Sequence, residues 1–393
     1  MHYQKIHTTL ICKRLLEGEP MHIIISPDSF KGTLTAKEAA QTMKDGLLRV
    51  FPRAQYTLIP IADGGEGTLE VLVELTEGQM QQVVVEDPLG RPVDARFGIL
   101  GDGKTAVIEM AEASGIMRVT KSERNPFRAS TYGTGELIRH ALDAGCRHFI
   151  LAIGGSATND GGIGAMRALG ARFLDGSGKV LETDLPSYQE LATIDLAGLD
   201  SRLPKCRFDI ACDVDNPLLG ERGATAIFGP QKGVDRRHHD VLESILARYA
   251  QVVEETTGKS VHELPGAGAA GGLGTAFLAF LPSTLRPGIE IILDEIDFDS
   301  KLDGASWVVT GEGKSDVQTL SGKAPLGIAF RAKKAGVPVA LLSGMVREED
   351  RVLLAPHFDL IESIVSPSCH LEEALSQPVP ALLAAAERLG KSF

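Results

Sequence analysis

One stretch, residues 149–166, constrains the fold of this chain more than any other. It reads FILAIGGSATNDGGIGAM, an apolar run of strand length, then a loop of Gly, Ser, Thr and Asn, then a segment suited to a helix. Glycines let the backbone turn sharply and approach a ligand closely, while Ser156 and Thr158 add hydroxyl groups beside the loop amides. The stretch predicts a strand, an anion-binding loop and a helix. A tight turn in a buried α/β unit is the alternative.

The glycine spacing of this loop matches neither of the common phosphate-binding fingerprints. A GxGxxG pattern starting at Gly162 would need glycine at Arg167, and no Walker A lysine follows. A second stretch, residues 266–274, reads GAGAAGGLG and does match GxGxxG. It follows the segment HELP rather than a buried strand, so the dinucleotide-binding context is missing. Its small residues are therefore expected to allow close packing or close ligand approach.

Acidic residues follow several predicted strands directly or nearly so. They are Asp28, Asp63, Asp213 and Glu312. In open parallel sheets, ligands bind outside the carboxyl ends of the strands, where these side chains would gather. Carboxylates placed there can hold magnesium or act as a general base. A turn or helix-cap role is the alternative for each of them.

The order of the predicted elements indicates an α/β protein with two domains. Short strands and helices alternate at both ends of the chain, whereas residues 83–110 show the alternation and turns of hairpins. We expect a discontinuous Rossmann-like or flavodoxin-like domain with a parallel sheet, formed by residues 21–66 and 287–393. A mixed α/β domain, residues 67–286, is inserted into it. The placement of residues 130–165 stays open between the two.

Composition disfavours several classes of partner and is consistent with one location. The 40 basic and 52 acidic residues give a net charge of −12, which disfavours nucleic acid or an anionic membrane as the main partner. The five cysteines form no CxxC pair, so neither a zinc site nor a redox motif is indicated, and a reducing cytoplasm fits. No run approaches the roughly 20 apolar residues of a membrane span. Residues 1–20 lack a signal-peptide core and are expected to be a mobile extension or an upstream start.

Three lysines in glycine-bearing loops complete the ingredients of a phosphoryl-transfer site. They are Lys31, Lys232 and Lys323, and ordinary solvated lysines are the alternative. Phosphoryl transfer needs cations, a magnesium ion between phosphates and a group that orients the attacking hydroxyl. Two other classes stay open at this point. A nicotinamide oxidoreductase would use the GxGxxG match, and a non-catalytic nucleotide-binding regulator would need the glycine loops but not the carboxylates.

Seven blocks, taken together, resemble the class I bacterial glycerate kinases. In chain order they are ISPDSFKG, ADGGEGT, GGSATNDGG, ACDVDNPL, FGPQKG, the glycines of residues 266–274, and TGEG, all between Met21 and Val365. The resemblance implies ATP- and magnesium-dependent phosphorylation of D-glycerate, usually to 2-phosphoglycerate, with ADP released by in-line transfer in an interdomain cleft. The 3-phosphoglycerate product, the domain that binds adenine, and the choice between monomer and homodimer stay open.

These motifs place the expected site residues. Asp28, Lys31, Asp213 and Lys232 are expected to be catalytic, with Asp213 and Lys232 at the transferring phosphoryl group. The base is expected to be Asp28, Asp63 or Asp213, and Asp63 and Asp213 are the expected metal ligands. The residues expected to bind nucleotide or glycerate are Asp63, Gly64, Gly65, Glu66, Gly154, Gly155, Ser156, Thr158, Asn159, Asp160, Asn216, Gln231, Gly268, Gly271, Gly311, Glu312 and Lys323.

Overall fold

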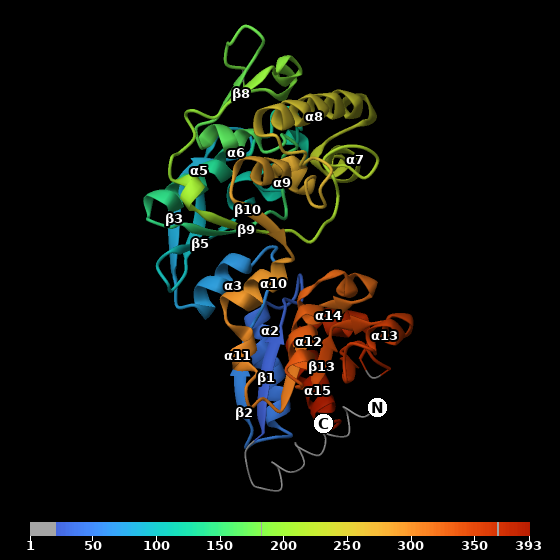
Figure 1. The fold of residues 1–393 in the computed structure, drawn as a ribbon. Helices are drawn as coiled ribbons and strands as arrows, with labels where there is room; N and C mark the ends of the chain where they lie inside the picture. The colour runs from blue at the N-terminus through green and yellow to red at the C-terminus, as the bar shows by residue number, and fades with distance from the viewer. Residues whose placement is uncertain (1–20, 182, 368) are drawn as a thin grey trace. The chain divides into compact units, whose positions relative to one another are not determined.

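The chain forms two compact units in a computed structural model (Figure 1). The structure describes residues 21–181, 183–367 and 369–393. Unit 1 is formed by the chain up to Asp63 and by Ile292–Phe393, and unit 2 is formed by Gly64–Ile291. The expected extension, residues 1–20, lies outside the described residues.

Unit 1 is built on a five-stranded parallel sheet. The strands are β1 (His22–Pro27), β2 (Gln55–Leu58), β11 (Trp307–Gly311), β13 (Val339–Ser343) and β15 (Leu360–Ser363). They stand in the order β15-β13-β11-β1-β2, the flavodoxin-like order of doubly wound sheets. The chain leaves β1 in one direction to β2 and continues from β11 in the other. This reversal makes a switch point between β1 and β11, where such sheets bind ligands.

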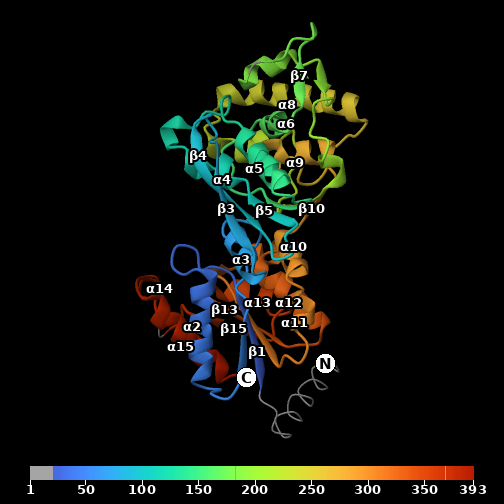
Figure 2. The same cartoon turned by 90° about the vertical axis from the view of Figure 1, so that its left-hand side faces the viewer.

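Helices cover this sheet, and two of them, α2 and α15, lie side by side (Figure 2). The helices are α2 (Ala36–Leu48), α10 (Gly288–Glu295), which contains the unit boundary, α11 (Phe298–Lys301), α12 (Ala324–Lys334), α13 (Glu348–Leu354), α14 (Leu371–Ser376) and α15 (Pro378–Gly390). Gly46 makes the α2–α15 contact close, because a Cβ there would lie 2.6 Å from the Ala386 Cβ. Ile23 and Ile25 of β1 share the same buried core with α2 and α15.

Helix α2 begins with the capping box that Thr35 and Glu38, three residues apart, indicate in the sequence. The Thr35 hydroxyl accepts a hydrogen bond from the Glu38 amide at 3.2 Å, and the Glu38 carboxylate accepts one from the Thr35 amide at 2.9 Å. This reciprocal pair satisfies two amides that the first turn of a helix leaves without partners. The capping box fixes where the chain turns after the loop that follows β1.

Unit 2 contains a six-stranded mixed sheet. Its strands are β3 (Gln79–Glu86), β4 (Pro92–Ile99), β5 (Thr105–Glu109), β6 (His148–Ala152), β9 (Arg207–Ala211) and β10 (Ser283–Arg286). The order is β10-β9-β6-β5-β4-β3, with the first four parallel and β3–β4 an antiparallel hairpin. The predicted hairpin pattern of residues 83–110 is therefore confirmed. Residues 130–165, which the sequence left unplaced, belong to this unit.

Seven described helices accompany this sheet. They are α3 (Thr68–Leu75), α4 (Ala111–Ser114), α5 (Tyr132–Asp143), α6 (Ile163–Ala168), α7 (Ala224–Phe228), α8 (Arg236–Thr257) and α9 (Ala269–Phe280). The predicted strand, loop and helix of residues 149–166 are confirmed as β6, the loop after it and α6. Phe149 of β6 stacks on Phe208 of β9, with ring centroids 4.6 Å apart, which fixes the central strands of the unit against each other.

Some element boundaries differ from the expectation. The sequence of residues 56–62 indicates one strand, but β2 ends at Leu58, although the amides of Ile59 and Ile61 still donate to carbonyls of β1. The sequence of residues 173–199 indicates a loop-rich region, but the structure has a small antiparallel pair there, β7 (Arg172–Leu174) and β8 (Thr193–Asp195). The predicted α/β class is confirmed. In the part of the chain that the structure describes, no helix has the length and apolarity to span a membrane.

Candidate active site

The loop after β6, residues 154–164 and hereafter the anion loop, is held from inside by a buried carboxylate. Asp160 accepts hydrogen bonds from the amide and hydroxyl of Thr131, each at 2.8 Å, and from the amides of Gly162 and Gly164, each at 3.1 Å. Burial raises the pKa of Asp160. With four donors already placed on it, this carboxylate organises the loop and the start of α6.

A lysine lies against the same loop. Lys232 Nζ donates to Ser156 Oγ and to the Thr158 carbonyl, each at 2.7 Å, and only 1% of the residue is exposed. Burial lowers the pKa of Lys232 to about 7, and the charge of Asp160 opposes that shift. The sequence predicted Lys232 as a cation of the site. The structure places its ammonium group within the loop, where it braces the backbone and supplies positive charge.

The start of the anion loop is open to a ligand. Gly154 and Gly155 are exposed, and Gly155 has a φ of +73°, a conformation that glycine adopts without strain. Among the described residues, none accepts a hydrogen bond from the amides of Gly154, Gly155 or Ser156. Such a run of available amides beside a buried ammonium group suits an anion.

Two buried oxygens of the loop also lack partners. Thr158 Oγ1 and Asn159 Oδ1 have no hydrogen-bond partner in the described structure, although Asn159 Nδ2 donates to Thr225 Oγ1 at 3.1 Å. Buried polar atoms are normally satisfied, so an unsatisfied pair in one loop indicates a place for a water or a ligand.

The GxGxxG stretch packs against the anion loop. Gly271 has a φ of +69°, and a Cβ on it would overlap the Thr158 carbonyl oxygen. Its own carbonyl accepts from the Gly161 amide at 2.9 Å. Gly268 packs in the same way on the loop after β9, where its amide donates to the Asn216 carbonyl at 2.9 Å. The expected close packing is confirmed.

The turn after Asp63 meets the ends of β6 and β9. A Cβ on Gly64 would lie 2.6 Å from the Gly288 Cα, and a Cβ on Gly154 would lie 3.9 Å from the Gly65 Cα. Asp213 Oδ1 accepts from the Gly288 amide at 3.0 Å. The structure thus brings Gly64, Gly65, Gly154 and Asp213 together at the carboxyl ends of parallel strands.

Other expected residues of unit 2 make local contacts. Glu66 and Gln231 are exposed, and the Gln231 carbonyl accepts from Arg124 at 2.9 Å. Asn216 Nδ2 donates to the Arg222 carbonyl at 2.8 Å. The contacts of Gln231 and Asn216 fix the backbone of their loops. Among the described residues, none of the three hydrogen-bonds to the anion loop.

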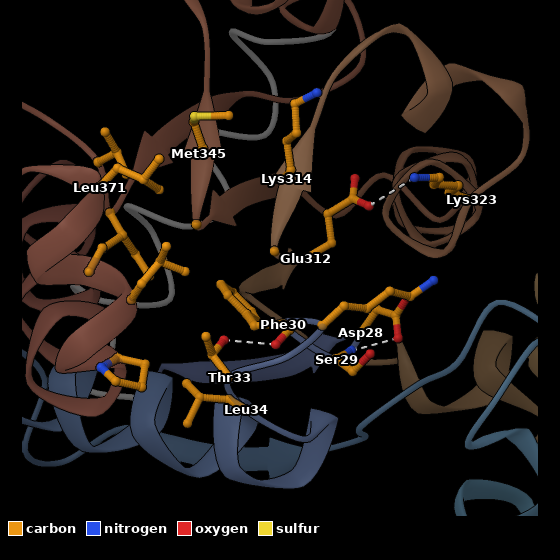
Figure 3. Close-up of a pocket in the computed structure, with 18 of the residues that line it drawn as sticks. Asp28, Ser29, Phe30, Thr33, Leu34, Glu312, Lys314, Lys323, Met345 and Leu371 are labelled. Carbon is orange, nitrogen blue, oxygen red and sulfur yellow. Dashed lines mark hydrogen bonds and ion pairs between the residues drawn. The ribbon is translucent and has the colours of Figure 1, made fainter. Parts of the chain in front are cut away.

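Unit 1 contains a cavity of about 270 Å³ at the carboxyl ends of β1 and β11 (Figure 3). It brings together five of the expected site residues, which are Asp28, Lys31, Asp63, Glu312 and Lys323. Gly311 stands just behind them, since its carbonyl accepts from the Asp28 amide at 2.8 Å and a Cβ on it would overlap a carbonyl of β13. The switch point of the sheet is therefore the charged end of this cavity.

Asp28 and Glu312 of this cavity are buried, and the charge of Asp63 acts on Asp28. Burial, with the charge of Asp63 adding to it, raises the pKa of Asp28 to about 7. Burial also raises the pKa of Glu312, whose carboxylate accepts from Ser315 Oγ at 2.9 Å and Thr319 Oγ1 at 2.6 Å. Lys323 Nζ lies 3.7 Å from Glu312 Oε2. A cluster of this kind would be stabilised by a cation.

Two features of the sites escaped the sequence reasoning. Glu109 ends β5, is buried, and accepts from the Leu69 amide at 2.9 Å; burial raises the pKa of Glu109 to about 7. A carboxylate at the end of the apolar run TAVIE was the signal. The second feature is an apolar wall of the unit 1 cavity, formed by Leu371, Ala374, Leu375 and Pro378. Their i, i+3, i+4, i+7 spacing was the signal.

Comparison with known proteins identifies the family. The sequence model of the glycerate kinase family matches residues 23–393. The chain belongs to the glycerate kinase family. It is therefore a kinase, and the resemblance drawn from its motifs is confirmed.

Individual relatives agree over most of the chain. A glycerate kinase of Bacillus subtilis (strain 168) is 49% identical over 354 residues, 90% of this chain and 93% of that protein. A glycerate 2-kinase of Escherichia coli (strain K12) is 44% identical over the same shares. A crystal structure from Salmonella typhimurium LT2 assigned to glycerate kinase 2 superposes with a TM-score of 0.86 at 43% identity, covering 95% of this chain and 98% of that one.

Proposed function

We propose that the protein transfers the γ-phosphoryl group of ATP to the C2 hydroxyl of D-glycerate, giving 2-phosphoglycerate and ADP. The observation that carries this proposal is the lysine-braced anion loop, with Lys232 2.7 Å from Ser156 Oγ and open amides at Gly154 and Gly155. Both substrates are anions, and the net charge of −12 makes a local cationic site necessary. Family membership supports glycerate as the acceptor.

The chemistry of phosphoryl transfer suggests a role for each expected side chain. The acceptor hydroxyl loses its proton to a carboxylate, its oxygen bonds to the γ-phosphorus, and the bond from that phosphorus to the bridging oxygen of ADP breaks. Asp28, Asp63 and Asp213 are the candidates for this base. The anion loop holds either the triphosphate or the glycerate carboxylate through its amides, and Lys31, Lys232 and Lys323 offset the negative charge.

A magnesium ion fits the carboxylates present. Within the described residues, no group of three or more His, Cys, Asp and Glu side chains is arranged to hold a metal. Magnesium in kinases is bound by only one or two carboxylates together with waters and substrate phosphates, so such a group is not required. Asp63, which lines the cavity beside Asp28, and Asp213 are the proposed ligands. When bound, the ion would neutralise charge on the phosphates.

Positioning supports attack by the C2 oxygen. A carboxylate anchored on loop amides places C2 nearest to the anchor, so a base beside the anchor reaches the C2 hydroxyl before the C3 hydroxyl. The Escherichia coli relative, 44% identical, is named a glycerate 2-kinase, which favours the same regiochemistry.

Enolase provides the test, because it accepts 2-phosphoglycerate directly and needs a mutase for the 3-isomer. The protein is incubated with magnesium-ATP and D-glycerate, the reaction is quenched, and enolase is added alone. Phosphoenolpyruvate is the expected product. A signal only after mutase is added would assign attack to C3 while supporting the kinase, and ATP that is bound but never consumed would support a regulator instead.

A further inference from the structure

We propose that the unit 1 cavity binds the adenosine part of ATP, with the base against α14 and the triphosphate toward Asp28 and Lys323. This inference rests on the proposed function, and it names the unit that receives the nucleotide. The motifs alone left that choice open.

The lining of the cavity has two chemically distinct sides. Figure 3 shows Leu34, Met345 and Leu371 toward one side and Glu312 and Lys323 toward the other. The apolar side also includes Ile364, Val365, Ala374, Leu375 and Pro378. Glycerate has a polar group on every carbon and gains little from such a wall. A purine base presents two apolar faces and does gain from it.

The apolar wall is exposed where a base would cover it. Leu371 and Leu375, one helical turn apart on α14, are 48% and 57% exposed. Both line the cavity rather than the outer surface alone. Contact with a flat ring would remove this apolar area from water, which is the main source of affinity for a base.

The other side carries charges of both signs. Lys31 and Lys323 stand beside the carboxyl groups of Asp28, Asp63 and Glu312. A simple carboxylate ligand would need only the cations, and the three acids would repel it. A polyphosphate with its divalent cation uses both, because lysines contact phosphate oxygens and carboxylates contact the metal.

Topology and size agree with a nucleotide. The charged side lies at the switch point between β1 and β11, the position at which doubly wound sheets of this order bind nucleotides. The volume, about 270 Å³, lies just below the range of small-molecule pockets, roughly 300–1,000 Å³. Glycerate would leave most of that space empty.

Photolabelling tests the location without requiring catalysis. The full chain is irradiated with 8-azido-ATP and magnesium in the absence of glycerate, and the labelled peptides are identified by mass spectrometry. We expect the label between residues 364 and 378, and excess ATP should suppress it. A label confined to unit 2 would overturn the inference even if the protein phosphorylates glycerate. A label at the expected place with no glycerate turnover would refute the proposed function and leave this inference standing.

A pair of matched variants tests the wall by kinetics. Leu371→Ser with Leu375→Ser should raise the KM for ATP about tenfold or more and leave the KM for glycerate unchanged. The control is Val352→Ser with Leu353→Ser on α13, which are 69% and 49% exposed and do not line the cavity. The control should match the parent in both KM values and in melting temperature.

Two other kinetic results would contradict the inference. A rise in the KM for glycerate alone would show that the cavity binds glycerate and not ATP. Parental values of both constants in the Leu371 and Leu375 variant would show that no substrate touches α14. If that variant does not fold, the photolabelling result on the parent protein decides the question.

Discussion

Lys232→Met should remove a pH-dependent contribution that lowers the free energy of unfolding of the parent protein. Lys232 is buried, and within the described part of the chain its ammonium group donates to two acceptors, Ser156 Oγ and the Thr158 carbonyl. Burial lowers the pKa of Lys232 from 10.5 to about 7, against the attraction of Asp160. Methionine has similar length and no charge, so it fills the space while removing the titrating group.

The direction in which stability changes with pH follows from how many protons the folded and unfolded states bind. Between pH 7 and pH 10.5 the unfolded chain holds a proton on Lys232 and the folded protein has largely lost it, because the folded pKa is the lower one. The unfolded state therefore binds more protons, and stability rises with pH across this window. The two pKa values differ by about 3.5, so the cost at acid pH is on the order of 5 kcal/mol.

The measurable part of this cost lies between pH 7 and pH 9. Over that interval the free energy of unfolding of the parent, relative to Lys232→Met, should rise by about 2 kcal/mol. Urea denaturation at pH 7, 8 and 9, followed by circular dichroism, gives both values. The control is Lys121→Met at an exposed position, which should show no such trend. A difference between parent and Lys232→Met that stays constant with pH would refute the reasoning.

Three further substitutions test the anion loop and its neighbours. Gly271→Ala should cost about 3 kcal/mol of stability, since its Cβ would overlap the Thr158 carbonyl at positive φ; an unchanged melting temperature would contradict this. Gly155→Val should abolish anion binding at a stability cost of about 1–2 kcal/mol; parental affinity for both ATP and glycerate would make the loop only a turn. Asp213→Asn should lower kcat about a hundredfold with an intact fold, and near-normal turnover would remove Asp213 from the site.

The positions of the acidic residues that follow strands could be predicted from the sequence, because neighbouring parallel strands end at the same edge of a sheet. Once β1 and β11 are recognised as buried parallel strands, Asp28 and Glu312 must emerge at the same edge of the sheet. The capping box at Thr35 and the β3–β4 hairpin depend on residues close together in the chain, so local patterns were sufficient for them as well.

Contacts between distant segments could not be predicted in this way. Lys232 was identified as a cation, but its partners lie 74 and 76 residues earlier, and no local pattern records that pairing. The same holds for Gly271, whose role depends on the Thr158 carbonyl. The apolar wall of the unit 1 cavity was missed for another reason: in the sequence, the spacing of apolar residues from Leu371 to Pro378 is that of an ordinary buried helix face.

The burial of Lys232 has a consequence for how the loop would meet an anion. With a pKa of about 7, Lys232 is only partly charged at neutral pH, so the folded protein does not hold a full unsatisfied charge in its interior. An anion on the amides of Gly154 and Gly155 would favour the ammonium form, because an opposite charge nearby raises the pKa of a lysine. Positive charge would then increase when it is needed to offset the ligand. A fixed charge, such as an arginine at this position, would carry its full desolvation cost in the empty protein as well.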